Sequence, residues 1–393
     1  MRRRVPRSIL AAVGLLAGVA VAAPSPAAAT TTTNVPVCKR APSGRVGCFA
    51  IRVDRWSDGR VRHGSSPTGY TPTDLRSAYA LPPAPAGRGR TVAVVDAYDD
   101  PRAEADLATY RSQFGLPACT ARTGCFRKVD QAGGHSYPTP DAGWAQEISL
   151  DLDMVSAVCP ACHLLLVEAT SSSQANLGKA VDTAVRLGAD AVSNSYGGPD
   201  ASDSSYGRYY HHPGVAITAS TGDSGYGVAY PASSKWVTAV GGTSLHRSST
   251  ARRGWSEGVW TGTGSGCSTL NAAPWQDEEF TGCSGRALAD IAAVANPATG
   301  VAVYDSYVFE DTSGWLTFGG TSASAPIIAG AFALAGNTDQ VTDGSWVWTH
   351  HRSGLNDITY GRNGTCSTTR WCTAHYGWDG PTGWGTPRGV AAL

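Results

Sequence analysis

The sequence has little charge and no surplus of either sign. Its 393 residues include 31 basic and 31 acidic ones, and charged residues make up 16% of the chain. A nucleic-acid partner therefore has no electrostatic support. Internal repeats and domain-sized linkers are missing as well. The hydrophobic share of 42% is typical of an ordered globular protein, and the length allows one large α/β domain or two modest ones.

Long apolar runs are missing after the N-terminus. There, the apolar run Ile9–Ala23 follows four arginines and precedes three alanines, residues 27–29, that offer a cleavage site. The run is too short to span a bilayer, and no later stretch does so. We therefore expect a secretory signal peptide at residues 1–29, an extracellular protein and no membrane span.

Cysteines without a close neighbour are also missing. An even number of cysteines in an exported protein favours disulfides, and nearest-neighbour pairing costs the least loop entropy, although the sequence leaves the connectivity open. The motif Cys159-Pro160-Ala161-Cys162 could also be a redox C-x-x-C. It follows a helical stretch and leads into an apolar run, so a structural clip is favoured. The five close pairs are Cys38/Cys48, Cys119/Cys125, Cys159/Cys162, Cys267/Cys283 and Cys366/Cys372.

Regular structure is expected from about residue 71 onward. Residues 30–70 have little periodicity and are predicted to be a short leader or N-terminal extension. The β-branched run Thr91–Asp96 is typical of a buried parallel strand. Strands that alternate with helices predict a parallel α/β sheet, so residues 71–393 are expected to form one domain. The other expected strands are 164–167, 191–195 and 215–220, and the expected helices are 103–114, 142–157 and 177–187.

A candidate nucleophile, Ser322, stands at the start of an apolar helix that runs to about Leu334. The turn Gly319-Gly320-Thr321 precedes it, and glycines let a substrate backbone come close. The helix N-terminus supplies free N–H groups where an oxyanion would form. The alternative is an inert serine that caps the helix.

Two carboxylates, Glu147 and Asp151, lie four residues apart in the predicted helix 142–157 and so share one face. A poised carboxylate can act as general base for a serine in acid, where histidine would be protonated. The alternative is a solvated acidic face. Asp153 points well away from this pair and is expected to be solvated.

A third carboxylate, Asp223, follows a buried strand on the loop Gly222-Asp223-Ser224-Gly225. Ligands collect at such loops in parallel α/β sheets. A protonated aspartic acid there could donate a hydrogen bond to an oxyanion. The alternative is a turn aspartate that bonds its own backbone.

Near the C-terminus, Asp357 and Asp379 are loop carboxylates among glycines. Such loops suit a calcium site built from carboxylates and backbone carbonyls. No EF-hand spacing is present, and ordinary turns would explain each residue separately.

Together, these segments resemble the sedolisin family of serine-carboxyl peptidases, which share a fold with the subtilisins. The resemblance covers about residues 70–389 and rests on landmarks in the family's order. They are Thr71-Pro72-Thr73-Asp74-Leu75-Arg76, Glu147-Ile148-Ser149-Leu150-Asp151, Ser193-Asn194-Ser195-Tyr196-Gly197-Gly198, Ser220-Thr221-Gly222-Asp223-Ser224-Gly225, Tyr230-Pro231-Ala232-Ser233-Ser234, Val240-Gly241-Gly242-Thr243, Gly320-Thr321-Ser322-Ala323-Ser324-Ala325-Pro326 and the stretch Gly377–Pro387.

The resemblance implies a subtilisin-like α/β fold, with a mostly parallel central sheet flanked by helices on both faces. It implies a secreted enzyme that cleaves proteins or peptides and binds one structural Ca²⁺. We expect this enzyme to be a monomer. In the implied site Ser322 is the nucleophile, Glu147 its general base, Asp151 the residue that orients Glu147, and Asp223 the oxyanion donor. Asp96 supports the carboxylates. The implied calcium ligands are the carboxylates of Asp357 and Asp379 and the carbonyls of Ile358, His375 and Gly377.

Two departures separate the sequence from the subtilisins. None of the nine histidines lies in a His-Gly-Thr-His segment, and Asp223 stands where subtilisins have asparagine. Both indicate an acid-active enzyme driven by carboxylates.

Two further departures concern the sedolisin pattern itself. His375 stands where glycine is common, and a positive φ there would strain it. The predicted leader, residues 30–70, is much shorter than the family's usual pro-domain. The alternative function is therefore a non-catalytic secreted binding protein that retains the peptidase fold.

Overall fold

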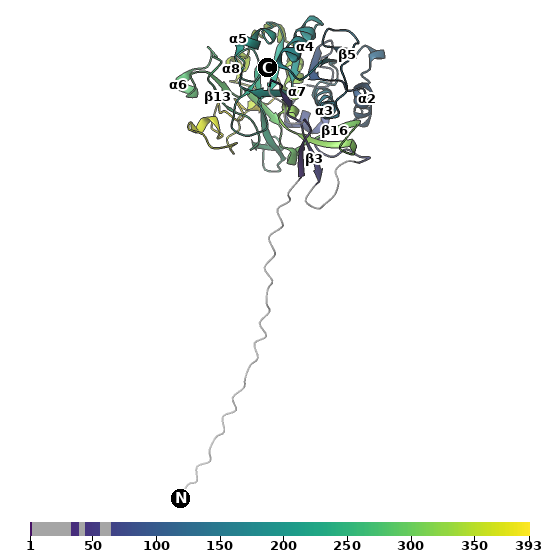
Figure 1. Cartoon of the computed structure of the whole chain (residues 1–393). Helices are drawn as coiled ribbons and strands as arrows, with labels where there is room; N and C mark the ends of the chain where they lie inside the picture. Colours follow the sequence, from purple (N-terminus) through teal and green to yellow (C-terminus); the bar gives the residue numbers. More distant parts are fainter. Residues whose placement is uncertain (2–32, 39–43, 56–63) are drawn as a thin grey trace.

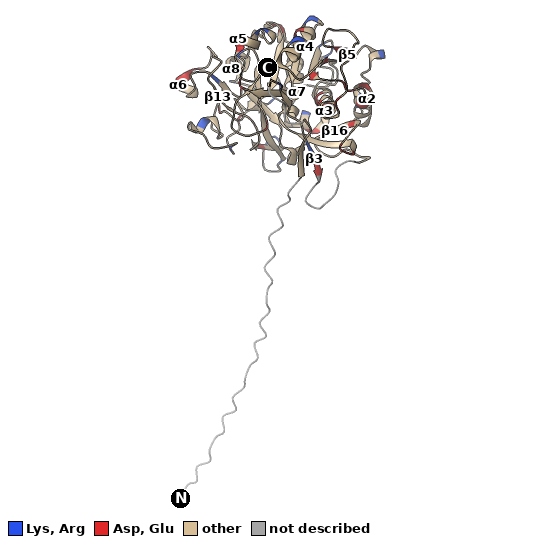
Figure 2. Ribbon diagram, in the orientation of Figure 1, with Lys and Arg blue, Asp and Glu red and all other residues tan. Residues whose placement is uncertain are grey.

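The computed structural model describes Met1 and residues 33–38, 44–55 and 64–393 (Figure 1). The predicted signal peptide lies outside the described residues, apart from Met1. None of the helices in these ranges combines the length and the apolar character that a bilayer crossing requires. Acidic and basic residues are interspersed over the ribbon (Figure 2), in keeping with the equal numbers of the two signs.

An eight-stranded sheet forms the centre of the fold, in the order β12-β11-β9-β7-β4-β6-β5, with β15 also paired to β11. Every pairing is parallel except that of β11 with β12. The four strands predicted from buried apolar runs are confirmed. The strands are β4 (Thr91–Ala97), β5 (Phe126–Asp130), β6 (His163–Ala169), β7 (Ala191–Asn194), β9 (Ala216–Ser220), β11 (Thr238–Arg247), β12 (Trp255–Val259) and β15 (Ile291–Val294).

Helices cover both faces of this sheet. Helices α3 and α7 pack side by side on one face, and α4 packs on β4 and β6 from the other. Aspartate and glycine mark the ends of the two central helices, since Asp141 caps α3 and Gly336 ends α7 with a φ of 77°. The helices are α1 (Pro72–Ala78), α2 (Ala103–Gln113), α3 (Ala142–Val158), α4 (Gln174–Arg186), α5 (Asp203–Tyr206), α6 (Glu278–Thr281), α7 (Thr321–Ala335) and α8 (Trp346–His350).

Helix α3 has no solvated side. Every residue after Ala142 is buried, because α1, α2, α7 and strand β16 surround the helix. The prediction that Asp153 is solvated is therefore wrong. Asp153 is 1% exposed, and its Oδ2 accepts a hydrogen bond from the Tyr304 backbone N–H at 3.0 Å.

Smaller antiparallel sheets lie beside the central one. One has the order β1-β3-β17-β16, and another the order β10-β8-β2. Figure 1 shows β3 and β16 at the lower edge of the domain, and β17 lies between them in the sheet. The strands are β1 (Thr33–Pro36), β2 (Gly47–Cys48), β3 (Ile51–Arg55), β8 (Tyr196–Pro199), β10 (Ala229–Tyr230), β16 (Val301–Phe309) and β17 (Thr312–Gly319), with the pairs β13 (Gly266–Ser268) and β14 (Arg286–Leu288), and β18 (Leu355–Asn356) and β19 (Thr386–Pro387).

All five cysteine pairs form disulfides between nearest neighbours, as expected. Cys159 and Cys162 are both fully buried and join the end of α3 to the start of β6. That position matches a structural clip.

Candidate active site

Ser322 lies where strand β17 turns into helix α7. Gly320 caps the helix with a φ of 95°, in the left-handed region that favours glycine. Ser322 is the second helical residue and fully buried, so it is not the cap that the inert alternative requires. Its hydroxyl donates a hydrogen bond to the Ser195 carbonyl oxygen at 3.1 Å. Within the described ranges no histidine hydrogen-bonds to Ser322.

Glu147 and Asp151 project from α3 toward α7, the helix that carries Ser322. Both carboxylates are fully buried, so they do not form a solvated acidic face. Asp151 Oδ1 accepts a hydrogen bond from Ser195 Oγ at 2.8 Å, and Glu147 Oε2 accepts one from the Ala50 backbone N–H at 2.9 Å. Glu147 Oε1 and Asp151 Oδ2 are buried without a partner among the described residues.

Asp96 completes a group of three buried carboxyls, Asp96, Glu147 and Asp151, which we call the catalytic cluster. Burial raises the pKa of Glu147 and of Asp151 well above their usual range, and repulsion from Asp96 raises both further. The nearby Ser322 hydroxyl opposes the rise at Glu147. Burial also raises the pKa of Asp96 to about 8. Among the described residues no cation pairs with this cluster.

Asp223 faces the turn that precedes Ser322. Its Oδ1 accepts hydrogen bonds from the backbone N–H and the hydroxyl of Thr321, both at 2.8 Å, so it is not a turn aspartate bonded to its own loop. Its Oδ2 is buried, lacks a partner in the described part of the chain, and would lie 2.6 Å from a Cβ placed on Gly320. Burial raises the pKa of Asp223 to about 7, and the Thr321 bonds oppose the rise. A protonated Oδ2 could donate to an oxyanion in this turn.

The predicted calcium residues lie together around one loop. Asp357 Oδ2 accepts from the Gly377 N–H at 2.9 Å, and Asp379 Oδ2 accepts from the His375 N–H at 3.1 Å. Asp379 is fully buried, and burial, with some repulsion from Asp357, raises its pKa to about 7. An oxygen-seeking cation would compensate such a carboxylate.

No group of three or more His, Cys, Asp or Glu side chains suited to a metal occurs in the described residues. A cation at this loop would thus depend on backbone carbonyls, such as that of Ile358, besides the two carboxylates. The expected strain at His375 does not arise, because it is not among the non-glycine residues with positive φ, whereas Gly377 has a φ of 79°.

Two parts of the site were not predicted from the sequence. Ser195 bonds both Ser322 and Asp151, and its place in the Ser193–Gly198 landmark was a signal for it. Phe49 and Ala50, from the predicted leader, also touch the site. They lie between two strands of only two and five residues, which are too short for periodicity to show.

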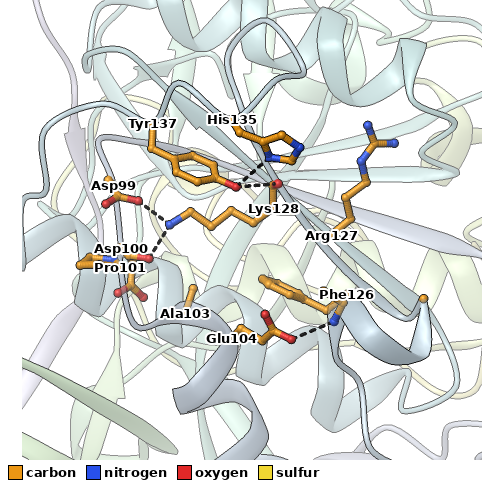
Figure 3. A pocket seen from close by; sticks show the side chains of 12 residues that line it. Asp99, Asp100, Pro101, Ala103, Glu104, Phe126, Arg127, Lys128, His135 and Tyr137 are labelled. Carbon is orange, nitrogen blue, oxygen red and sulfur yellow. Dashed lines mark hydrogen bonds and ion pairs between the residues drawn. The ribbon is translucent and has the colours of Figure 1, made fainter.

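Two hollows lie near these features. One of about 270 Å³ is bounded by Phe49, Asp223 and the glycines of the 197–198 and 222–227 loops. A larger one, of about 620 Å³, opens between the β4–α2 connection and β5 (Figure 3). Figure 3 shows Lys128 reaching across it to Asp99 and to the Asp100 carbonyl. Ser322 does not line this larger hollow, so we assign the chemistry elsewhere.

Comparisons with known proteins agree with the geometry. Residues 133–353 match the subtilase family. Kumamolisin from Bacillus sp. (strain MN-32) is 31% identical over 387 residues, which cover 87% of this chain and 67% of kumamolisin. Sedolisin from Pseudomonas sp. (strain 101) is 26% identical over 381 residues, covering 86% of this chain and 62% of sedolisin. The chain thus spans about two thirds of these curated relatives.

A solved structure gives the same result. Pseudomonas sedolisin, complexed with two molecules of pseudo-iodotyrostatin, superposes with a TM-score of 0.67 at 25% identity. The superposition covers 82% of this chain and 96% of that one. The central sheet and its flanking helices are therefore those of the subtilisin-like fold.

Proposed function

We propose that this chain, which belongs to the sedolisin family of serine-carboxyl peptidases, hydrolyses peptide bonds in acid through an acyl-enzyme on Ser322, with Glu147 as general base. The observation that carries the proposal is the pairing of a buried serine at a helix N-terminus with a buried carboxylate on the adjacent helix. Substrates are proteins or peptides.

Each residue has one role in the reaction. Ser322 Oγ attacks the peptide carbonyl, and Glu147 takes the hydroxyl proton and passes it to the leaving nitrogen. Asp151, held by Ser195, orients Glu147. The protonated Oδ2 of Asp223 donates to the developing oxyanion. Water then hydrolyses the acyl-enzyme with Glu147 again as base.

The carboxyl groups set the pH range. The catalytic cluster titrates as a unit, because its members repel each other, so its first proton leaves at lower pH than its last. For Glu147 to act as the base in acid, the first of these ionisations must occur in the acid range. Asp223, with its pKa near 7, stays protonated through the acid range and loses its donor proton above it. Activity is therefore highest in acid and falls as the pH rises past about 7.

Calcium and export complete the proposal. The carboxylates of Asp357 and Asp379, with the carbonyls of Ile358, His375 and Gly377, would hold one Ca²⁺. The ion would compensate the buried Asp379 and fix the loop. A chelator is expected to lower the melting temperature and added Ca²⁺ to restore it. The five disulfides support an oxidising compartment, in agreement with the predicted secretion.

A digest of an unfolded protein substrate between pH 3 and about 8, the range of carboxylate and histidine titration, tests the activity. Cleavage that peaks in acid and disappears in Ser322→Ala supports the proposal. Cleavage that survives Ser322→Ala contradicts it. Binding of substrate-like peptides without cleavage at any pH would favour the alternative, a non-catalytic binding protein with this fold.

A further inference from the structure

Asp223 lies in residues 221–228, the loop that connects β9 to β10, which we call the Asp223 loop. On one side this loop contacts Thr321, the residue before Ser322. Asp223 Oδ1 accepts from the Thr321 N–H and hydroxyl, and the Gly222 N–H donates to Thr321 Oγ1 at 3.1 Å. These bonds tie Asp223 to the start of α7. The position of the carboxyl group also depends on what holds the other side of the loop.

The other side of the Asp223 loop is bound by residues 260–265, which connect β12 to β13 and which we call the β12–β13 connection. The two segments lie side by side and bond each other through their backbones, as two strands would. Four hydrogen bonds of 2.7 to 3.1 Å join them, from the Gly264 N–H to Gly222, from the Gly225 N–H to Gly262, from the Gly227 N–H to Ser265 and from the Ser265 N–H to Gly227.

The backbones of these two segments are in direct contact. A Cβ placed on Gly264 would lie 1.9 Å from the Thr221 carbonyl oxygen, so only glycine allows this approach. Thr221 Oγ1 also lies 3.4 Å from Thr263 Oγ1. Close-packed groups transmit a displacement to each other rather than absorb it. A shift of the β12–β13 connection would therefore move Thr221 and Gly222, and with them the neighbouring Asp223.

Asn363 bonds both segments at once. Its Nδ2 donates to the Thr263 carbonyl oxygen at 2.6 Å and to Ser265 Oγ at 2.8 Å, both in the β12–β13 connection. Its own carbonyl oxygen accepts from the Tyr226 N–H of the Asp223 loop at 3.1 Å. The same oxygen would lie 2.7 Å from a Cβ on Gly225. Asn363 thus fixes the two segments relative to each other.

The C-terminal part of the chain anchors Asn363. Its N–H donates to the Cys372 carbonyl oxygen at 3.0 Å, and Cys372 forms a disulfide with Cys366. Ser265 Oγ donates to the carbonyl oxygen of the adjacent Trp371 at 2.6 Å. The support of the Asp223 loop therefore comes from a segment that is distant in the sequence and braced by its own disulfide.

The side chain of Asn363 is buried at a cost. The residue is 5% exposed, and its Oδ1 is buried without a hydrogen-bond partner among the described residues. An unpaired buried oxygen is unfavourable, and an apolar side chain would avoid this cost. What asparagine adds at this position is therefore the pair of N–H donors that hold Thr263 and Ser265.

We propose that Asn363 is a positioning residue for peptide hydrolysis, whose side-chain amide holds the Asp223 carboxyl group at the oxyanion site through the β12–β13 connection. Asn363 acts on the reaction through Asp223. The inference rests on the proposed function, which makes Asp223 the oxyanion donor. Because the oxyanion forms in the transition state and not in the bound substrate, the effect of Asn363 falls on kcat rather than on KM.

Removing the side-chain amide tests this role. Asn363→Ala should lower kcat about 10- to 100-fold, since a misplacement of about 1 Å costs about 100-fold and loss of an oxyanion donor about 10²–10³-fold. KM should stay within about threefold, because the β12–β13 connection carries neither Ser322 nor Glu147. Steady-state kinetics at about pH 5 measure both constants, with a fluorogenic peptide that spans a site cleaved in the protein digest.

A double-mutant cycle tests whether Asn363 acts through Asp223. Asp223→Ala alone should lower kcat about 10²–10³-fold, and adding Asn363→Ala should lower it by less than about threefold more, because the donor is already absent. The matched control is Asn271→Ala. Asn271 is also 5% exposed and its Nδ2 donates to the Ala201 carbonyl oxygen at 2.8 Å, so its loss should be the same with and without Asp223→Ala. Additive losses for Asn363→Ala and Asp223→Ala would overturn the inference.

The titration of Asp223 separates this inference from the proposed function, because it requires no hydrolysis. Infrared difference spectra of each protein against its own Asp223→Asn form follow the Asp223 carboxyl band between about pH 3 and 9. Burial raises the pKa of Asp223 to about 7, and this effect outweighs the bonds from Thr321. In Asn363→Ala the loop should admit water, so the pKa should fall by about one unit or more. It should not change in Asn271→Ala.

The titration decides the inference even without activity. If the pKa falls in Asn363→Ala but no form hydrolyses peptides, Asn363 positions Asp223 and the proposed function fails. A pKa that stays within about half a unit of the wild-type value would contradict the inference, whatever the activities. Melting curves verify that each variant folds. If Asn363→Ala does not, Asn363→Ser replaces it, because a serine hydroxyl is too short to reach the Thr263 carbonyl.

Discussion

Two of the buried acidic clusters in the described part of the chain can be compared, and only one of the two is assigned chemistry. The lysine-paired cluster consists of Asp99, Asp100 and Glu168 around Lys128, whose Nζ is 3.0 Å from Glu168 Oε1. Burial raises the pKa of Glu168 to about 9 despite Lys128, and that of Asp96 in the catalytic cluster to about 8. A raised pKa is thus common to both. The difference is what the carboxyl groups face, a lysine ammonium in one cluster and a serine hydroxyl in the other.

The largest expected effect is a loss of activity when a carboxylate of the catalytic cluster is removed. Glu147→Gln should lower kcat/KM by about 10⁴-fold or more, because loss of a base in a coupled nucleophilic site removes most of its rate enhancement. Glu168→Gln, the matched change in the lysine-paired cluster, should leave kcat/KM within about threefold. Steady-state kinetics in acid measure both values of kcat/KM. Equal losses in the two variants would contradict the distinction between the clusters.

The next largest effect is a loss of stability when the lysine of the lysine-paired cluster is removed. Lys128→Met leaves the Asp99 carboxylate without its cation, and removing one partner of a buried ion pair costs about 3–5 kcal/mol. The change should lower the free energy of unfolding at neutral pH and leave the kcat/KM of the folded enzyme unchanged. Denaturant titration and kinetics test this, with exposed Lys179→Met as the control. A large activity loss without destabilisation would contradict the assignment.

A smaller expected effect is a shift of the pH–activity profile when Asp223 is replaced. Its pKa of about 7 means that the donor proton is present below neutral pH and lost above it. Asp223→Asn keeps an N–H donor at every pH, so the upper limit of the pH–activity profile should move upward by about one unit. The profile of kcat/KM between about pH 3 and 9 gives the answer. An unchanged upper limit would contradict a protonated Asp223.

The smallest expected effect is on how the stability of the folded state depends on pH. The folded-state pKa of Asp96, about 8, lies above its ordinary value of 3.8, so the folded state holds the proton more tightly than the unfolded state. Stability from this group is full below about pH 4 and is lost as the pH rises toward about 8. The melting temperature should fall by several degrees over this range, and less in Asp96→Asn. If the melting temperatures of the wild-type protein and Asp96→Asn fall equally with rising pH, Asp96 does not make this contribution.

The parts of the fold that depend on a local sequence pattern could be predicted from the sequence. Buried β-branched runs such as Thr91–Asp96 gave the central strands, and the four-residue spacing of Glu147 and Asp151 placed both carboxylates on one face of α3. The prediction for Asp153 was wrong, because tertiary packing surrounds α3 completely. The sequence also indicated no secondary structure for residues 44–55, whose short strands include pairings with strands more than a hundred residues away.

The enclosure of α3 also has a consequence for how the molecule opens. Backbone amides exchange with solvent through local openings wherever an element has a weakly packed side. Helices α3 and α7 are buried along nearly all their length, so their amides should exchange only through global unfolding. The residues that carry Glu147 and Ser322 should therefore be among the slowest to take up deuterium. Activity should persist until the whole domain melts.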